Sequence, residues 1–208
     1  MATAIIVILL TGYLLGNLNG SVCISVLMEH DDVRGKGSGN AGLTNFYRNF
    51  GGKYTLLVAA TDMAKAILAC LVGKMILEPY DLGVEGLMLG ALAVSLGHDF
   101  PALLGFKGGK GILSGFSIAI AADWRIALLG LLLFALCFGL THYVSLGSVV
   151  AAAALGVGFV ILYWEHPVAM ACGVFLAALA IFMHRENISR LINGTESKIY
   201  LTKKGKAS

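Results

Sequence analysis

Long apolar runs alternate with short polar segments along the whole chain. Each run predicts a helical span, because a helix needs roughly 20 mainly apolar residues to cross a bilayer. We place these spans at residues 3–28, 54–77, 84–97, 111–122, 125–141, 146–163 and 167–183. The third and fourth are short, so five to seven crossings, or a re-entrant segment over 84–122, fit the pattern. The sequence therefore predicts an all-α integral membrane protein with about seven transmembrane helices, some of them short.

The positive charges gather in alternate loops. Twelve of the 15 Lys and Arg residues lie in segments 29–53, 98–110 and 184–208. Cytoplasmic loops of membrane proteins are enriched in these residues. We therefore predict that the N-terminus lies outside, that the C-terminus is cytoplasmic, and that the three basic segments share the cytoplasmic face. The last of them ends in a basic tail, residues 199–208, which we expect to be mobile and to lie near anionic headgroups.

The composition agrees with a membrane environment. The chain is 58% hydrophobic and only 13% charged, whereas soluble domains are nearer half apolar and a quarter charged. The spans use most of residues 1–208, which predicts a single polytopic membrane domain. The first run is too long and too weakly cationic for a cleaved signal peptide. All four cysteines lie in apolar runs without paired spacing, so we expect packing residues and no metal site. The net charge of +3 is explained by topology and indicates no nucleic-acid partner.

The first predicted cytoplasmic loop is rich in glycine and in neutral donors. It reads Arg34-Gly-Lys-Gly-Ser-Gly-Asn-Ala-Gly-Leu-Thr-Asn-Phe-Tyr-Arg48. Glycines let the backbone turn its N–H groups toward one point, which suits an anion, and Arg48 adds a cationic fork. The spacing is not that of a nucleotide P-loop, and a flexible linker is the competing interpretation. The candidate binding residues are Gly37, Ser38, Gly39, Asn40, Thr44, Asn45 and Arg48.

The second loop reads Gly97-His-Asp-Phe-Pro-Ala-Leu-Leu-Gly-Phe-Lys-Gly-Gly-Lys-Gly111. A Gly-rich turn that opens into a helix offers free N–H groups, a positive dipole end and, here, lysine charges, which predicts a phosphate site. A tight connection with lysines extended to the interface is the alternative. His98 is a candidate general base, or a residue that caps or orients the loop. The candidate phosphate-binding residues are Lys107, Gly108, Gly109, Lys110 and Gly111.

A third polar segment follows the last predicted span. It reads His184-Arg-Glu-Asn-Ile-Ser-Arg-Leu-Ile-Asn-Gly-Thr-Glu-Ser-Lys198. If the helix continues past residue 183, His184, Asn187 and Arg190 share one face, which suits a hydroxylated anionic molecule. Glu196 and Lys198 are predicted to form structural ion pairs.

Two further features lie in or beside the spans. Asp62 and Lys65 are three residues apart inside an apolar run, where ionisable groups are costly; we favour mutual pairing over catalysis. The segment Tyr143-Val-Ser-Leu-Gly-Ser148 brings two hydroxyls, those of Ser145 and Ser148, to the same face as the three loops. Together these residues predict a phosphorylated substrate reached from the cytoplasm, with room for an acyl chain among the helices.

These motifs resemble one known family over nearly the whole chain. Gly37–Asn45 with Arg48, Gly97-His-Asp-Phe-Pro101 with Phe106–Gly111, and His184-x-x-Asn-Ile-x-Arg190 with Gly194-x-Glu-x-Lys198 resemble its three signature motifs. Asp62-x-x-Lys65 and Tyr143-x-Ser145-Leu extend the match. The family is the bacterial acyl-phosphate-dependent glycerol-3-phosphate acyltransferases (PlsY).

The resemblance implies an enzyme of the bacterial inner membrane that acts at the cytoplasmic face. It would transfer a fatty acyl group from acyl phosphate to the 1-hydroxyl of glycerol 3-phosphate, giving lysophosphatidic acid and inorganic phosphate, without a cofactor. The partners would be these substrates and membrane lipid, for a monomeric protein. Ser38, Arg48, Lys110, His184 and Asn187 would be catalytic, the other loop residues and Ser145 would bind substrate, and His98, Asp62, Lys65 and Glu196 would be structural.

The sequence departs from the family pattern at packing and turn positions. The differences are Gly16-Asn-Leu-Asn19, Ala41, Ala66 and Ile-Leu-Ser at 112–114; they bear on helix geometry more than on chemistry. A transporter for a phosphorylated anion is the rival function, but internal two-half symmetry is not evident. A structural scaffold would leave the donor-rich loops unexplained.

Overall fold

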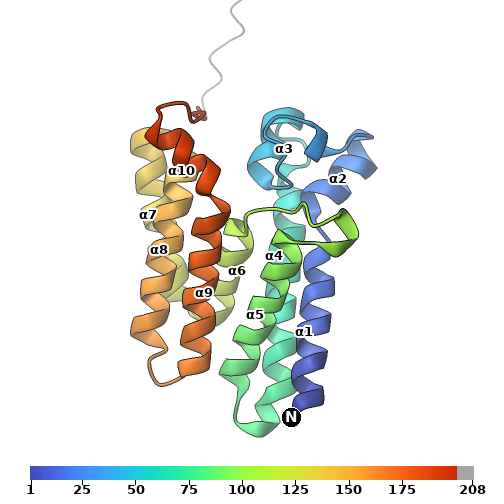
Figure 1. Cartoon of the computed structure of the whole chain (residues 1–208), viewed down its shortest axis with the longest axis vertical. Helices are drawn as coiled ribbons and strands as arrows, with labels where there is room; N and C mark the ends of the chain where they lie inside the picture. Colours follow the sequence, from blue (N-terminus) through green and yellow to red (C-terminus); the bar gives the residue numbers. More distant parts are fainter. Residues whose placement is uncertain (201–208) are drawn as a thin grey trace, which may run out of the picture.

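The computed structural model describes residues 1–200 and is built of helices joined by loops (Figure 1). The short helices η1, η2 and η3 are 3-10 turns. In chain order the elements are α1 (Ala2–Asn17), α2 (Gly20–Glu29), η1 (Val33–Gly35), α3 (Leu43–Phe50), α4 (Thr55–Leu77), η2 (Glu78–Tyr80), α5 (Gly83–Asp99), η3 (Ala102–Leu104), α6 (Ile112–Ala122), α7 (Trp124–Thr141), α8 (Val144–Leu162), α9 (Pro167–Met183) and α10 (Arg185–Ile192).

The long helices form two groups. Helices α1, α4 and α5 pack on one another, α7, α8 and α9 form the second group, and α6 contacts members of both. Figure 1 shows α2, α3 and α10 at one end of the molecule, opposite the N-terminus. We call this the loop end. Because both Gly-rich loops and the segment after α9 reach it, sequence-distant polar segments meet there.

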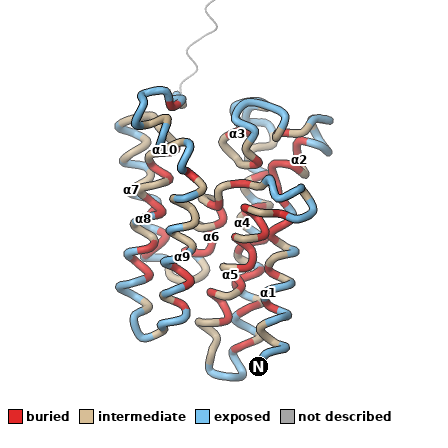
Figure 2. The backbone as a smooth tube through the Cα atoms, in the orientation of Figure 1, coloured by how far each residue is buried: buried red, intermediate tan, exposed pale blue. Residues whose placement is uncertain are grey.

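The helices have the apolar exterior that lipid requires. Large apolar side chains point outward, among them Leu56 at 83% exposed and Leu140 at 76%. Figure 2 shows the buried positions on the facing sides of the helices. By length and composition, five helical segments of the described chain could cross a membrane, and the bent pair α9–α10 would make six. The 11-residue α6 is a shorter apolar helix. The all-helical membrane fold is confirmed, with each predicted run on a helix.

The first predicted span, residues 3–28, corresponds to one apolar segment that could cross a membrane, Ala2–Glu29, but its helix is interrupted. Helix α1 ends at Asn17 and α2 begins at Gly20. The Asn19 side chain accepts a hydrogen bond from the Val22 amide, 3.1 Å away, and so caps α2. Buried polar partners from α4, described below, satisfy the backbone groups that the break releases. Hydropathy alone does not reveal such a break.

The last helix also does not continue straight past residue 183. Helices α9 and α10 meet at His184 with a bend of 53°. We expected His184, Asn187 and Arg190 to share one helix face if the helix continued past residue 183. It does not continue straight, so this expectation does not apply. Asn187 and Arg190 lie on α10, while His184 lies at the joint. The predicted tail, residues 199–208, lies outside the described residues apart from Ile199 and Tyr200.

Close helix contacts at glycine shape the first group. A Cβ on Gly86 of α5 would lie 2.2 Å from the Gly73 carbonyl oxygen of α4, and one on Gly97 would lie 2.2 Å from the Tyr13 carbonyl oxygen of α1. Neither position has room for a methyl group. The glycines therefore allow α5 to pack against two neighbours at backbone distance, which is a common device in membranes.

We expect Gly86→Ala to lower the free energy of unfolding by roughly 1–3 kcal/mol, because overpacking forces the two backbones apart. The measurement is the thermal midpoint in detergent. Gly139→Ala on α7 is the matched control, since a Cβ there meets nothing within 4 Å. Equal midpoints for the two variants would contradict this account of the α4–α5 contact.

Candidate active site

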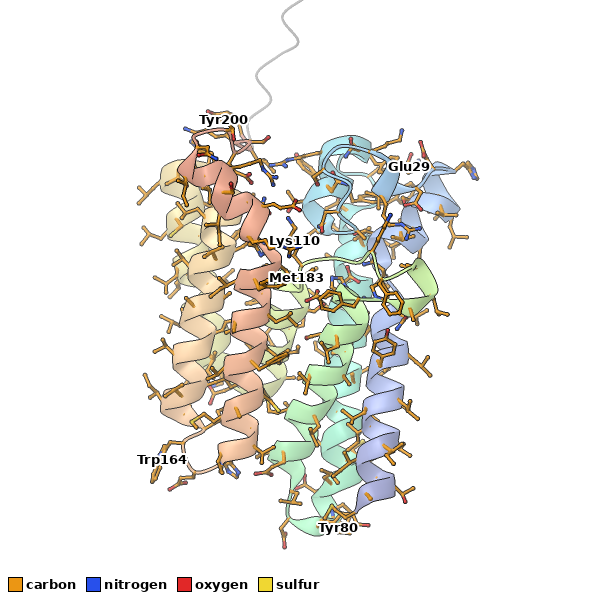
Figure 3. All side chains as sticks on the ribbon, viewed as in Figure 1. Glu29, Tyr80, Lys110, Trp164, Met183 and Tyr200 are labelled. Atoms are coloured by element: carbon orange, nitrogen blue, oxygen red, sulfur yellow. The ribbon has the colours of Figure 1, made fainter. Side chains whose placement is uncertain are left out.

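One cavity of about 750 Å³ joins the loop end to the space between the helix groups. Its polar end is lined by the first loop, α3, the end of the second loop, and α10 with the segment after it. Figure 3 shows Lys110 between the two helix groups, near the level of Met183. The deeper part is lined by apolar side chains of α6, α7, α8 and α9: Phe116, Ile118, Leu131, Phe134, Ala151, Leu155, Phe159 and Leu176.

The first loop is organised around a buried asparagine. The Asn45 side-chain amide donates to the carbonyl oxygens of Val33, Lys36 and Asn40, each 3.0 Å away. Its oxygen accepts from the Ser38 amide at 3.1 Å. Asn45 therefore uses its hydrogen-bonding capacity on the loop itself, which makes it an anchor of the loop more than a ligand of substrate.

Glycine is required where this loop turns. Gly37 has φ +55°, and a Cβ there would lie 2.5 Å from Asn45 Oδ1. Gly37, Ser38, Asn40, Thr44 and Arg48 line the cavity, as predicted. The Arg48 guanidinium donates to the Ser197 carbonyl oxygen, 3.2 Å away, and so reaches the opposite wall.

The second loop approaches the first through its backbone. The Ala41 amide donates to the Gly108 carbonyl oxygen at 3.3 Å. Lys110 then points into the cavity and donates to Asn187 Oδ1 on α10. Gly111, with φ +69°, precedes α6, whose first turn has no side-chain cap. This end of α6 therefore presents backbone N–H groups beside Lys110, as predicted for a phosphate site.

The structure divides the predicted cradle 107–111. Lys110 and Gly111 line the cavity, but Lys107 lies with Gly39, Arg34 and Asp32 in a separate depression. Gly108 and Gly109 pack against His98, where a Cβ on Gly109 would lie 2.1 Å from His98 Nε2. The direct binding that we predicted for Gly39, Lys107, Gly108 and Gly109 has no support in their positions. The two lysines therefore line different hollows, although they are only three residues apart.

The third segment is tied together by a carboxylate. Glu196 accepts from the Asn187 amide at 2.8 Å and from Arg190 Nε at 2.7 Å, so the predicted structural pairing of Glu196 is confirmed. Lys198 was predicted to pair likewise, but its ammonium lies 5.1 Å from the centre of the Tyr143 ring. Glu196 therefore also positions the Asn187 side chain, whose oxygen accepts the hydrogen bond from Lys110.

His184 and Ser145 bring free polar atoms to this wall of the cavity. His184 is 5% exposed, and its Nδ1 lies 2.8 Å from the Ala180 carbonyl oxygen. Because a carbonyl only accepts, we assign the proton to Nδ1, which leaves Nε2 as an acceptor. The Ser145 hydroxyl is buried near the Glu196 carboxylate and forms no hydrogen bond of standard geometry with the described part of the protein. Both residues line the cavity and are available to a hydroxylated ligand.

Burial and neighbouring groups shift the pKa values of Lys110 and Glu196. Burial lowers the pKa of the Lys110 ammonium, and the positive charge of Arg190 lowers it further. Burial alone would raise the pKa of the Glu196 carboxyl, but the hydrogen bonds from Asn187 and Arg190 outweigh burial and hold the pKa below its usual range. The site is thus a cationic surface in which Glu196 stays ionised.

We expect Glu196 to make folding stability depend on acid pH. Because its pKa is lower in the folded chain than in the unfolded one, its contribution is complete above the usual carboxyl range and is lost as pH falls through that range. The thermal midpoint of the wild type should fall with pH more steeply than that of Glu196→Gln. Parallel curves for the two proteins would contradict this role.

Several lining residues escaped the sequence interpretation: Asn49, Ser95, Asp99 and Ser197. Helical spacing could have indicated one of them, since Asn49 follows Asn45 by four residues. Ser95 and Asp99 line the cavity because α5 lies beside the loops. No spacing in the sequence indicates it.

The predicted pairing of Asp62 with Lys65 is confirmed. The carboxylate and the ammonium lie 2.8 Å apart, with the side chains 3% and 4% exposed. His98 Nδ1 lies 2.9 Å from Lys65 Nζ, and its backbone carbonyl accepts from the Gly109 amide. Of the two roles considered for His98, this geometry favours orienting the loop.

Comparisons with known proteins agree with this architecture. The sequence matches the family described as glycerol-3-phosphate acyltransferase over residues 6–194. It is 42% identical to the glycerol-3-phosphate acyltransferase of Anaeromyxobacter dehalogenans (strain 2CP-1) over 190 residues, which cover 90% of this chain and 94% of the relative. Identity to the enzyme of Thermoanaerobacter sp. (strain X514) is 38%, over 90% of this chain and 91% of the relative.

A solved structure extends the likeness to three dimensions. It is described as PlsY (YgiH), an integral membrane glycerol 3-phosphate acyltransferase, in its glycerol 3-phosphate form. The TM-score is 0.83 at 32% identity, over 94% of this chain and 96% of that one. A lysophosphatidic acid form matches with a TM-score of 0.79 at 30% identity, over 94% of this chain and 95% of that one. On these grounds, this chain belongs to the glycerol-3-phosphate acyltransferase family.

Proposed function

We propose that this protein transfers a fatty acyl group from acyl phosphate to the 1-hydroxyl of glycerol 3-phosphate, releasing lysophosphatidic acid and inorganic phosphate. One observation carries the proposal: a single cavity joins a cationic, donor-rich end to an apolar channel. An acyl phosphate needs both parts, because its phosphate requires hydrogen-bond donors and positive charge while its fatty chain requires an apolar channel. Membership of the family supports acyl transfer to glycerol 3-phosphate, and solved relatives are described with glycerol 3-phosphate and with lysophosphatidic acid.

The residues divide the work between the two substrates. Ser38, Lys110 and the first turn of α6 hold the acyl phosphate and stabilise negative charge on the carbonyl oxygen and the departing phosphate. The opposite wall, with Arg48, positions glycerol 3-phosphate so that its hydroxyl meets the acyl carbon. As the new C–O bond forms, the bond from the acyl carbon to the phosphate oxygen breaks. Phosphate is a good leaving group, so no cofactor is needed. The acceptor-positioning residues are Arg48, Ser145, His184 and Asn187.

The proton of the attacking hydroxyl has two candidate acceptors, His184 Nε2 and the phosphate of glycerol 3-phosphate. The pH–rate profile of His184→Ala separates them. Loss of an acid limb of the profile supports the histidine. An unchanged profile with a higher KM supports the substrate phosphate.

We further propose one polytopic domain over residues 1–208, acting as a monomer in the bacterial inner membrane. The loop end would be cytoplasmic and the N-terminus outside, because the basic segments gather at the loop end. Soluble glycerol 3-phosphate would then enter from the cytoplasm, while the acyl chain would arrive from the bilayer beside α6–α9.

An assay of the purified protein with acyl phosphate and, separately, with acyl-CoA tests donor class and activity together. We expect lysophosphatidic acid and phosphate from acyl phosphate, and only when glycerol 3-phosphate is present. Activity with acyl-CoA alone would refute the donor assignment. Uptake of glycerol 3-phosphate into proteoliposomes without any acyl transfer would favour the rival, a transporter of phosphorylated anions.

A further inference from the structure

A buried polar cluster lies beneath both Gly-rich loops. Its members are Asp62 and Lys65, one turn apart on α4, and His98 near the end of α5. Besides the 2.8 Å ion pair and the 2.9 Å contact between Lys65 and His98, His98 Nδ1 lies 3.8 Å from Asp62 Oδ1. Asp62 and His98 line the edge of the same cavity, but the chemistry proposed above assigns no role to any of these three side chains.

The cluster holds the break between α1 and α2. Lys65 Nζ donates to the carbonyl oxygens of Gly16 and Leu18, at 3.2 and 2.8 Å. Asp62 Oδ1 accepts from the Gly20 amide at 3.1 Å. A helix end leaves such backbone groups without partners, and in a membrane the orphaned groups would be costly. The ion pair therefore fixes where α1 ends and α2 begins.

The break leads to the first loop. Asn19, which caps α2, also donates through its side-chain amide to the Ala41 carbonyl oxygen, 3.0 Å away. Ala41 lies between Ser38 and Arg48 in the sequence and is fully buried. The position of the break thereby sets the position of the loop that carries both residues.

The same cluster holds the second loop. The His98 carbonyl oxygen accepts from the Gly109 amide at 3.1 Å, and the His98 ring packs directly against Gly109. Lys110 is the next residue. The hydrogen bond from Ala41 to Gly108 then closes a ring of contacts that joins the cluster, the break and both loops.

Stability alone is a weak reason for a buried ion pair, because well-packed apolar residues often serve as well or better. We propose that Asp62, Lys65 and His98 are positioning residues for acyl transfer: they hold the two Gly-rich loops against each other and so set Lys110 opposite Ser38 and Arg48. The inference rests on the proposed function, and it extends that function to residues that need not touch substrate.

A double-mutant cycle tests this coupling. The variant Asp62→Leu/Lys65→Met removes the charges together, so no unpaired charge is left buried. We expect it to lower kcat/KM by roughly 30-fold in the wild-type background but by less than about threefold when Lys110→Ala is already present, because residues that act through one group are not additive. A purely structural role predicts equal losses in both backgrounds. Equal losses, or unchanged activity, would overturn the inference.

The matched control is Glu85→Gln/His166→Gln. It removes another polar pair, in which Glu85 Oε1 on α5 lies 3.0 Å from Nδ1 of His166, the residue before α9; this pair is far from the loop end. Its activity should stay within about threefold of wild type. Thermal midpoints establish that each variant folds. Lys65→Arg is the second variant, which keeps the positive charge but spreads it over a guanidinium fork. We expect a smaller loss of kcat/KM, which should disappear when Lys110→Ala is already present. A loss that persists in the Lys110→Ala background would count against the inference.

Hydrogen exchange supplies a readout that does not depend on activity. In Asp62→Leu/Lys65→Met, the amides of Gly20, Ala41 and Gly109 should exchange faster, while those of α8 should not change. Unchanged exchange at all three would refute the proposed linkage. A wild type that makes no lysophosphatidic acid would refute the proposed function instead, so the two failures are distinct.

Discussion

Replacing Lys110 by alanine is expected to lower kcat/KM for acyl transfer by roughly 10³-fold, the size of effect seen when a group aimed at developing charge is removed. Lys110 is the lysine of its loop that lines the cavity, and its ammonium is held by Asn187. Without it, the negative charge on the carbonyl oxygen and the departing phosphate loses its nearest flexible cation. Initial-rate kinetics with varied acyl phosphate and varied glycerol 3-phosphate would measure the loss.

Lys107 is the control, because it has the same side chain three residues away but lies outside the cavity. Lys107→Ala should change kcat/KM by less than about threefold, as surface substitutions usually do. Similar losses in the two variants would mean that both lysines reach the substrate, and the division of the loop described above would be wrong. A loss confined to Lys107→Ala would contradict the role proposed for Lys110.

The second large effect is expected at Arg48. Arg48→Ala should raise KM for glycerol 3-phosphate and lower kcat/KM by roughly 10²-fold, because a hydrogen bond to a charged group is worth more than a neutral one. Arg48 extends from α3 across the polar end of the cavity to Ser197, so it can contact a phosphate held between the two walls. Varying the concentration of glycerol 3-phosphate at saturating acyl phosphate would separate KM from kcat.

Two further substitutions make this prediction specific. Arg48→Lys should recover only part of the activity, since a lysine provides a point charge without the fork. Arg185 is also a basic residue near the loop end, but its guanidinium stacks on the Phe182 ring at 4.6 Å and does not line the cavity. Arg185→Ala should therefore change activity little. A KM that is unchanged in Arg48→Ala would show that this residue does not bind glycerol 3-phosphate.

The helical membrane fold could be predicted from the sequence because lipid imposes a simple requirement. Every backbone polar group in the bilayer needs an internal partner, so long apolar runs have few structures open to them. The site was predictable for a similarly local reason. Gly37, Ser38, Lys110 and Gly111 lie within short segments where glycine freedom and a helix start determine the geometry. Residues of this kind were found at the cavity, as expected.

Other features depended on contacts between residues far apart in the sequence. Lys107 and Lys110 look equivalent in the sequence, but in the fold Gly108 and Gly109 pack against His98 and only Lys110 lines the cavity. Asn45 looked like a ligand until its partners in the folded loop were known. The direction of a side chain from a Gly-rich loop is set by what the loop packs on, which local spacing does not encode.

The sequence by itself determined the apolar helices, the three basic segments and the residue types of the site. Tertiary structure decided the break at Leu18 and Asn19, the bend of 53° at His184, and the alignment of the loops above Asp62, Lys65 and His98. The physical reason is the same in each case. Backbone groups released at a break or a turn must find partners, and in this fold those partners come from other helices.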